Sequence, residues 1–264
     1  MNLLNQHLSK REQIIPFLSS TFKKSQKNAL NEQAVPSYLH SSFLVRETFW
    51  LRIVQAHAQA KTGERVLDFG SGLGAMLPWH LKSYRETHLY DSHPMVMQHL
   101  EELKKNEPYT DLKLHMTLQS LKELPENYFD TIFALDVLEH VDNLPDVLVE
   151  LKRLLKPKGK LVVSSPTENW IYKFSRNFGG EGYKGEYHIR AAKEVEEDLQ
   201  RFFKVKLKAR VYPIFTFAKC LGKYSFCSLF FDAFGQSFFL VLLSKPNSPE
   251  QFGEQIIKSA LAGN

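Results

Sequence analysis

The sequence predicts an α/β fold in which a parallel sheet is covered by helices on both faces. From Arg65 onward, short apolar runs alternate with stretches of helical periodicity. This alternation is typical of βαβ crossovers, which bury a parallel sheet on both sides. A glycine-rich segment follows the first run, where a first strand would turn into a first helix. With 264 residues, of which 43% are hydrophobic, the chain is long enough to bury one full core.

The expected strands are short apolar runs separated by turn residues or helical stretches. In chain order they are Arg65–Phe69, His88–Tyr90, Leu112–Met116, Thr131–Leu135, Leu161–Ser164, Lys204–Val211 and Ser237–Leu243. A turn is predicted at Lys156–Gly159, because Pro157 and Gly159 interrupt the apolar pattern just before the fifth run.

The expected helices show apolar residues at intervals of three and four. They are Ser41–Ala60, Met76–Tyr84, Met95–Lys105, Leu144–Leu155 and Ala191–Phe203. Gly63 is an end signal for the first of these, and Pro16 and Pro36 restrict the first 36 residues to short helices.

Composition excludes several classes of protein. No stretch approaches the roughly 18 uncharged apolar residues of a spanning helix, so no integral membrane segment is expected. The net charge of +5 comes from scattered lysines and permits an anionic partner without implying one. The two cysteines, Cys220 and Cys227, form neither a disulfide framework nor a C-x-x-C motif, which favours a reducing, cytoplasmic setting. The first 31 residues resemble an organellar presequence only weakly, since such peptides favour Arg.

The segment Val66–Gly74 carries the most chemical information. Glycines let the backbone turn tightly and approach a ligand, and the helix that follows points free N–H groups at it. The pattern also fits the dinucleotide fingerprint G-x-G-x-x-G/A, so a nicotinamide or flavin cofactor stays open on the glycines alone. Asp68 favours a ligand with a cationic head, because a carboxylate there would repel a pyrophosphate. Asp91 follows at about the 20 residues expected for a carboxylate that binds ribose hydroxyls, although a helix cap is an alternative.

These motifs resemble class I S-adenosylmethionine-dependent methyltransferases, most closely the group of ubiquinone-biosynthesis O-methyltransferases. The resemblance covers roughly residues 60–165 and rests on four segments in the family's order: Val66–Gly74, Asp91, Tyr128–Val141 and Leu154–Leu161. It implies a Rossmann-like sheet of seven strands, mostly parallel, with an antiparallel last strand. It also implies S-adenosylmethionine as the cofactor.

The resemblance also implies where the cofactor binds. Gly70, Gly72 and the backbone of Phe69 would hold the methionine part, with Asp68 near its amino group, and Asp91 would bind both ribose hydroxyls. The adenine edge would face Ser120 and Leu121, although Ser120 stands where the family most often has an acid. Leu135 and Asp136 would border the methyl group.

The chain is expected to be a single methyltransferase domain over residues 1–264. Within it we expect an N-terminal helical extension at 1–60, a cofactor-binding core at 61–165, an acceptor-side half with an aromatic insertion at 166–245, and a C-terminal tail at 246–264. The aromatic insertion could line the pocket of an aromatic or lipid-like acceptor, contact a membrane surface, or form a satellite core. The oligomeric state is left open.

Methyl transfer to oxygen needs a base, and two histidines are candidates. His140 follows the fourth strand and His188 follows the fifth, so both should lie at the carboxyl ends of the strands. A divalent metal held by these histidines with Asp136 and Glu139 is an alternative that the prediction leaves out.

The predicted function is methyl transfer to a small molecule, at oxygen in preference to nitrogen. RNA, DNA or protein methylation is the first alternative. Nucleic acid is not expected, because the segment after the fourth strand reads Leu-Asp-Val-Leu and lacks the Asn/Asp-Pro-Pro-aromatic string of base-amino methyltransferases. A nonenzymatic module that binds the cofactor is the second alternative.

Overall fold

The computed structural model describes residues 53, 56–60, 62–106, 111–166, 189–211 and 238–244. Three predictions therefore fall wholly or almost wholly outside the described residues: the N-terminal helical extension, the aromatic insertion and the C-terminal tail. His188 also lies outside them.

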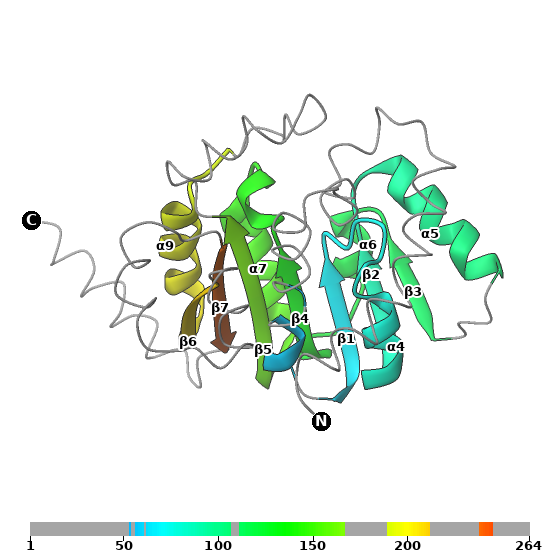
Figure 1. Cartoon of the computed structure of the whole chain (residues 1–264), viewed down its shortest axis with the longest axis horizontal. Helices are drawn as coiled ribbons and strands as arrows, with labels where there is room; N and C mark the ends of the chain where they lie inside the picture. Colours follow the sequence, from blue (N-terminus) through cyan, green and yellow to red (C-terminus); the bar gives the residue numbers. More distant parts are fainter. Residues whose placement is uncertain are drawn as a thin grey trace, which may run out of the picture.

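Five parallel strands form the centre of the sheet. They are β1 (Gly63–Phe69), β2 (Tyr84–Tyr90), β3 (Leu112–His115), β4 (Phe129–Leu135) and β5 (Leu155–Pro166). Their order is β3-β2-β1-β4-β5, so β1 and β4 lie side by side at the centre (Figure 1). The strand order reverses between β1 and β4, which is where open α/β sheets bind ligands. The predicted α/β Rossmann-like fold with a parallel sheet is confirmed.

Two further strands extend the sheet beyond β5. These are β6 (Lys204–Val211) and β7 (Phe238–Ser244), and β7 pairs antiparallel with both β5 and β6. The two strands lie at the edge opposite β3 (Figure 1).

Helices cover both faces of the sheet. One core cluster joins α4 (Leu77–Ser83) and α5 (Pro94–Asn106) to the sheet. The other joins α6 (Leu118–Lys122), α7 (Leu144–Leu154) and α9 (Ala192–Phe202) to the opposite face. Successive residues of β1, such as Val66 and Leu67, belong to different clusters because side chains alternate along a strand. No helix in these ranges has the length and hydropathy to cross a membrane.

The structure differs from the predicted elements at three places. The turn predicted at Lys156–Gly159 is wrong: these residues belong to β5, where a register shift opposite β4 accommodates them as a bulge. The strand β2 begins at Tyr84, which the pattern placed in a helix. The Tyr84 side chain is buried and its hydroxyl donates to Thr131 at 2.9 Å. The short helix α6 was not predicted, and the side chain of Thr117 caps it by accepting from the Ser120 N–H.

Candidate cofactor site

The glycine loop folds over the end of the neighbouring strand. Gly70, Gly72 and Gly74 have φ of +75°, +50° and +78°, a region that favours glycine. The backbone N–H groups of Gly70 and Ser71 both donate to the carbonyl of Tyr90, at 2.8 and 3.0 Å. The loop after β1 is therefore anchored directly on the last residue of β2.

Gly70 also allows a close approach between the loops after β1 and β4. A Cβ at Gly70 would lie 2.4 Å from Cγ2 of Val137, closer than real carbon atoms pack. Glycine at this position brings the cofactor loop against the segment that follows β4. Candidate residues from these two central strands are thus brought together.

Asp91 lies at the end of β2 and organises the loop around it. Its carboxylate accepts the N–H of Gly72 on Oδ2 and the N–H of His93 on Oδ1, each at 2.9 Å. Burial raises the pKa of Asp91, and the hydrogen bonds from His93 and Gly72 oppose that effect. A carboxylate oxygen has two lone pairs, so each oxygen keeps an acceptor position beyond these bonds. Such an arrangement fits the two hydroxyl groups of a ribose.

Asp68 faces the core rather than the carboxyl edge of the sheet. Its Oδ2 lies 3.2 Å from Nε2 of His80 on α4, and both side chains are buried. The next residue, Phe69, is also buried, and its ring stacks on Tyr90 with centroids 4.5 Å apart. The side chains of Asp68 and Phe69 thus support the glycine loop from behind.

Ser120 and Leu121 lie on α6, which follows β3. The Ser120 hydroxyl donates to the carbonyl of Thr117 at 2.7 Å and lies 3.2 Å from Nδ1 of His115. Leu121 is fully buried within the core, and its carbonyl accepts a hydrogen bond from Arg153. Of these two residues, only Ser120 has a partly exposed side chain.

The end of β4 carries the remaining predicted residues. Asp136 has a φ of +52°, and its Oδ1 accepts the hydroxyl of Ser164 at 2.6 Å. Leu135 and Asp136 are both half-buried. A backbone in this region is uncommon outside glycine and is often found at functional sites.

His140 is half-buried in the 3-10 helix η2 (Leu138–His140), which follows β4. The backbone N–H of Ile189 donates at 3.0 Å to the carbonyl of Glu139, the residue before His140. The Arg190 guanidinium donates to the carbonyls of Val141 and Asp142. The chain just after His188 is therefore joined to the chain on both sides of His140.

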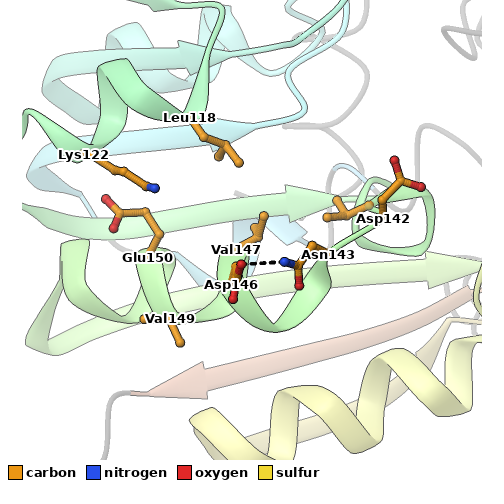
Figure 2. A pocket seen from close by; sticks show the side chains of 9 residues that line it. Leu118, Lys122, Asp142, Asn143, Asp146, Val147, Val149 and Glu150 are labelled. Atoms are coloured by element: carbon orange, nitrogen blue, oxygen red, sulfur yellow. Dashed lines mark hydrogen bonds between the residues drawn. The ribbon is translucent and has the colours of Figure 1, made fainter.

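A pocket of about 510 Å³ lies between α6 and α7. Figure 2 shows Lys122 of α6 and Glu150 of α7 extending from facing helices. The charged residues that line this pocket are Asp142, Asp146, Glu150 and Lys122. Within the described ranges, no group of three or more His, Cys, Asp and Glu side chains could hold a metal ion.

Sequence reasoning missed several histidines around this site, of which His80, His88 and His115 are buried. His80 pairs with Asp68, the backbone of His93 contacts Asp91, and His88 of β2 is hydrogen-bonded to His115 of β3. The available signal was a histidine inside an apolar strand pattern, which occurs in both β2 and β3.

Comparison with known proteins places the chain in a family. Residues 44–224 match the family model described as a methyltransferase domain. The chain therefore belongs to this methyltransferase family, and the predicted resemblance to S-adenosylmethionine-dependent methyltransferases is confirmed.

Solved structures share the fold. One is the N-methyltransferase NodS from Bradyrhizobium japonicum WM9 in complex with S-adenosyl-L-homocysteine, with a TM-score of 0.56 and 15% identity over 86% of this chain and 98% of that one. Another is a SAM-dependent methyltransferase from Aquifex aeolicus, with a TM-score of 0.54 and 17% identity over 87% of this chain and 98% of that one.

Curated relatives differ in their acceptors. A tRNA U34 carboxymethyltransferase from Pseudoalteromonas atlantica is 31% identical over 44% of this chain, and a mitochondrial ubiquinone biosynthesis O-methyltransferase from Schizosaccharomyces pombe is 28% identical over 39%. The matches span only 36% and 38% of those two relatives. The prediction that nucleic acid is not a partner is not supported by the comparisons, because the name of one relative includes tRNA.

Proposed function

We propose that this protein transfers a methyl group from S-adenosylmethionine to a small-molecule acceptor, at oxygen. The observation that carries the proposal is the junction of Asp91 with the glycine loop. It pairs a buried carboxylate, with one acceptor position remaining on each oxygen, and a tight backbone turn at the centre of the sheet. A ribose and an amino-acid group joined through sulfur match this combination.

The proposed cofactor contacts are those that the resemblance to the family implies. In the proposed complex Gly70, Gly72 and the backbone of Phe69 hold the methionine part, and Asp91 holds the ribose. The side chain of Asp68 lies behind the glycine loop and supports it there, paired with His80. Ser120 and Leu121 border the adenine, and Leu135 and Asp136 border the methyl group.

The chemistry needs alignment and a base. The bound sulfonium supplies an activated methyl group whose leaving group departs neutral, so alignment contributes most of the rate. For an oxygen acceptor, His140 is the proposed base, with His188 as the second candidate. The hydrogen bond of Ile189 to Glu139 supports this pairing, because it joins the chain segments that carry the two histidines.

A tRNA acceptor is a second candidate function, favoured by the relatives named as tRNA U34 carboxymethyltransferases. The acidic pocket between α6 and α7 argues against it. Glu150 is already paired with Arg153, so Asp142, Asp146 and Lys122 carry the remaining charges of the lining, which gives no cationic surface for a phosphate backbone.

The test has two stages. Calorimetric titration with S-adenosylmethionine, S-adenosylhomocysteine and NADH should show binding of the first two and none of NADH. Transfer of a labelled methyl group should then be measured with phenols, catechols, amines and unmodified tRNA, and label is expected in the hydroxyl compounds. Binding without turnover on any acceptor would favour a nonenzymatic module, and label in tRNA would favour the second candidate.

Several finer features belong to the same proposal. We infer that the complete sheet has seven strands with an antiparallel last strand, and the backbone pairing of β7 with β5 and β6 supports this. The single domain over 1–264, with its four parts, and a cytoplasmic setting remain predictions.

A further inference from the structure

A chain of hydrogen bonds crosses the sheet from β2 to α6. Nε2 of His88 lies 2.8 Å from Oε1 of Glu86, and Nδ1 of His88 lies 2.8 Å from Nε2 of His115. Nδ1 of His115 lies 3.2 Å from the hydroxyl of Ser120, which donates to the carbonyl of Thr117 at 2.7 Å. Both imidazoles are buried and stacked, with centroids 5.0 Å apart.

The positions of the protons along this chain follow from its end at Thr117. A carbonyl cannot donate, so the single hydroxyl proton of Ser120 points at Thr117. Ser120 must then accept from Nδ1–H of His115, which leaves Nε2 of a neutral His115 as an acceptor. Nδ1 of His88 therefore donates to His115. Nε2 of His88 must also carry a proton, because it faces the carboxylate of Glu86. This assignment of donors and acceptors places one extra proton on His88.

Removing that proton reverses the chain. With one proton fewer, Nε2–H of His88 still donates to Glu86, Nε2–H of His115 donates to Nδ1 of His88, and the hydroxyl of Ser120 donates to His115. The proton that leaves goes to solvent. Ser120 then no longer donates to Thr117, and two oxygens 2.7 Å apart without a hydrogen between them repel one another.

The groups around the two histidines act on their pKa values in opposite directions. Burial lowers the pKa of His88, and the hydrogen bond and charge of Glu86 oppose that effect. Arg65 and Tyr128 both donate to Glu86, and Lys113 and Arg65 add positive charge nearby. Burial and the charge of His88 lower the pKa of His115 to about 4, so the pair resists a second proton.

His115 also contacts the ribose side of the proposed site. Its backbone carbonyl accepts the N–H of Asp91 at 3.1 Å, and its imidazole contacts Ser120. One residue at the end of β3 therefore holds both the proposed ribose contact and the proposed adenine contact.

We propose that His115 is a positioning residue for the adenosine half of S-adenosylmethionine, and that a proton held between Glu86 and His88 sets the direction of the hydrogen-bond chain that ends at Ser120. This inference rests on the proposed function. In the protonated state Ser120 is fixed by two hydrogen bonds and keeps one lone pair for the amino group of adenine. In the deprotonated state it is fixed by one.

The first experiment needs no cofactor. Long-range ¹⁵N–¹H NMR spectra of the full chain, with imidazoles assigned from single histidine variants, report which nitrogens carry protons as the pH rises from about 5 to about 8. We expect His88 to change from doubly to singly protonated and the proton of His115 to move from Nδ1 to Nε2 in the same step. Titration of His88 with no change of tautomer at His115 would overturn the proposed reversal.

The second experiment measures binding by calorimetry over the same pH range. Affinity for S-adenosylhomocysteine should fall about fivefold as the chain reverses, because Ser120 then loses one of the two hydrogen bonds that fix it. One net hydrogen bond is worth about that factor. S-inosylhomocysteine, which lacks the adenine amino group, should show no such change. An equal pH dependence for both ligands would overturn the role of Ser120. If neither ligand binds at any pH, the proposed function fails, whereas the NMR result stands by itself.

Two substitutions of His115 separate positioning from packing. His115→Asn keeps an amide N–H near the place of Nδ1 and should retain affinity but lose its pH dependence. In His115→Gln the amide group reaches toward His88 and away from Ser120. This variant should bind S-adenosylhomocysteine about fivefold more weakly at low pH. Ser120→Ala tests the same contact without altering the histidines, and His99→Gln on α5 is the control. Wild-type affinity and pH dependence in both His115→Gln and Ser120→Ala would overturn the proposal.

Discussion

Gly72 and Asp91 are joined by a hydrogen bond of 2.9 Å from the glycine N–H to the carboxylate at the end of β2. The same carboxylate accepts the N–H of His93, so it fixes two loops at once. A ribose at this position would meet a carboxylate whose orientation is already set. Little ordering would remain to be done on binding, which favours affinity.

Asp91→Ala should therefore weaken binding of S-adenosylhomocysteine severely. Losing its charge-assisted contacts should cost about 2–3 kcal/mol, or roughly 30- to 150-fold in Kd. Calorimetry on the folded variant is the measurement. Asp111→Asn removes the charge of an exposed carboxylate before β3 and serves as the control. Unchanged affinity in Asp91→Ala would remove the ribose assignment.

Gly70→Ala should destabilise the protein by about 2–5 kcal/mol, the sum of a left-handed backbone penalty and overpacking against Val137. Urea unfolding measures the change. Adding Val137→Ala should recover only part of the steric penalty, because the Cβ of residue 137 stays 2.6 Å from the new methyl group. Gly74→Ala is the matched comparison, because its φ is also positive but its Cβ would lie 3.3 Å from Cδ2 of Leu100. If Gly70→Ala is no worse than Gly74→Ala, the close contact with Val137 is absent.

His80→Ala leaves the carboxylate of Asp68 buried without its partner, which should cost about 3–5 kcal/mol. A double-mutant cycle with Asp68→Asn should show strong coupling, measured by urea unfolding. The exposed pair Lys193–Glu197, at 3.6 Å, is the control cycle, and its coupling should stay below about 0.5 kcal/mol. Additive effects at Asp68 and His80 would contradict the buried pair.

Local patterns predicted the parts of the fold that depend on neighbouring residues. Strand ends marked by Asp91 and by the glycine loop are readable because turn chemistry and apolar periodicity are properties of short segments. The bulge in β5 depends on register with β4, and β2 begins early because Tyr84 meets Thr131 of another strand. Such long-range pairings leave no local signal.

The candidate site shows the same division. The position of Asp68 at the end of β1 was predictable, but the direction of its side chain was not, because that depends on His80 in the next helix. The contacts of Ser120 likewise depend on His115 of β3 and on a short helix with weak periodicity. Residues at strand ends can therefore be proposed from sequence, whereas their partners require the structure.

Arg190→Ala should lower turnover while leaving cofactor affinity unchanged. The guanidinium donates to the carbonyls of Val141 and Asp142, which follow His140, and its hydrogen bonds within the described residues reach none of the proposed cofactor residues. We expect kcat to fall about tenfold or more, since misplacement of a catalytic group by an ångström is costly. Calorimetry with S-adenosylhomocysteine and methyl-transfer assays separate the two effects. Arg201→Ala removes an exposed arginine that pairs with Asp198 on α9 and should change neither. Loss of cofactor affinity in Arg190→Ala would instead place this residue in cofactor binding.

Stability should fall in acid partly through His115. Its pKa is lowered by burial and by His88 to about 4, below the ordinary value of about 6.5. Between about pH 4 and about pH 6.5 the unfolded chain binds more protons than the folded one, so the free energy of unfolding rises with pH across that range. The contribution of His115 to stability is therefore present above about pH 6.5 and is lost as the pH falls toward about 4. The full contribution is about 3 kcal/mol. Urea unfolding from about pH 4 to about pH 7 should show a flatter pH dependence for His115→Gln than for the wild type. Parallel curves for wild type and His115→Gln would mean that His115 titrates normally in the folded protein.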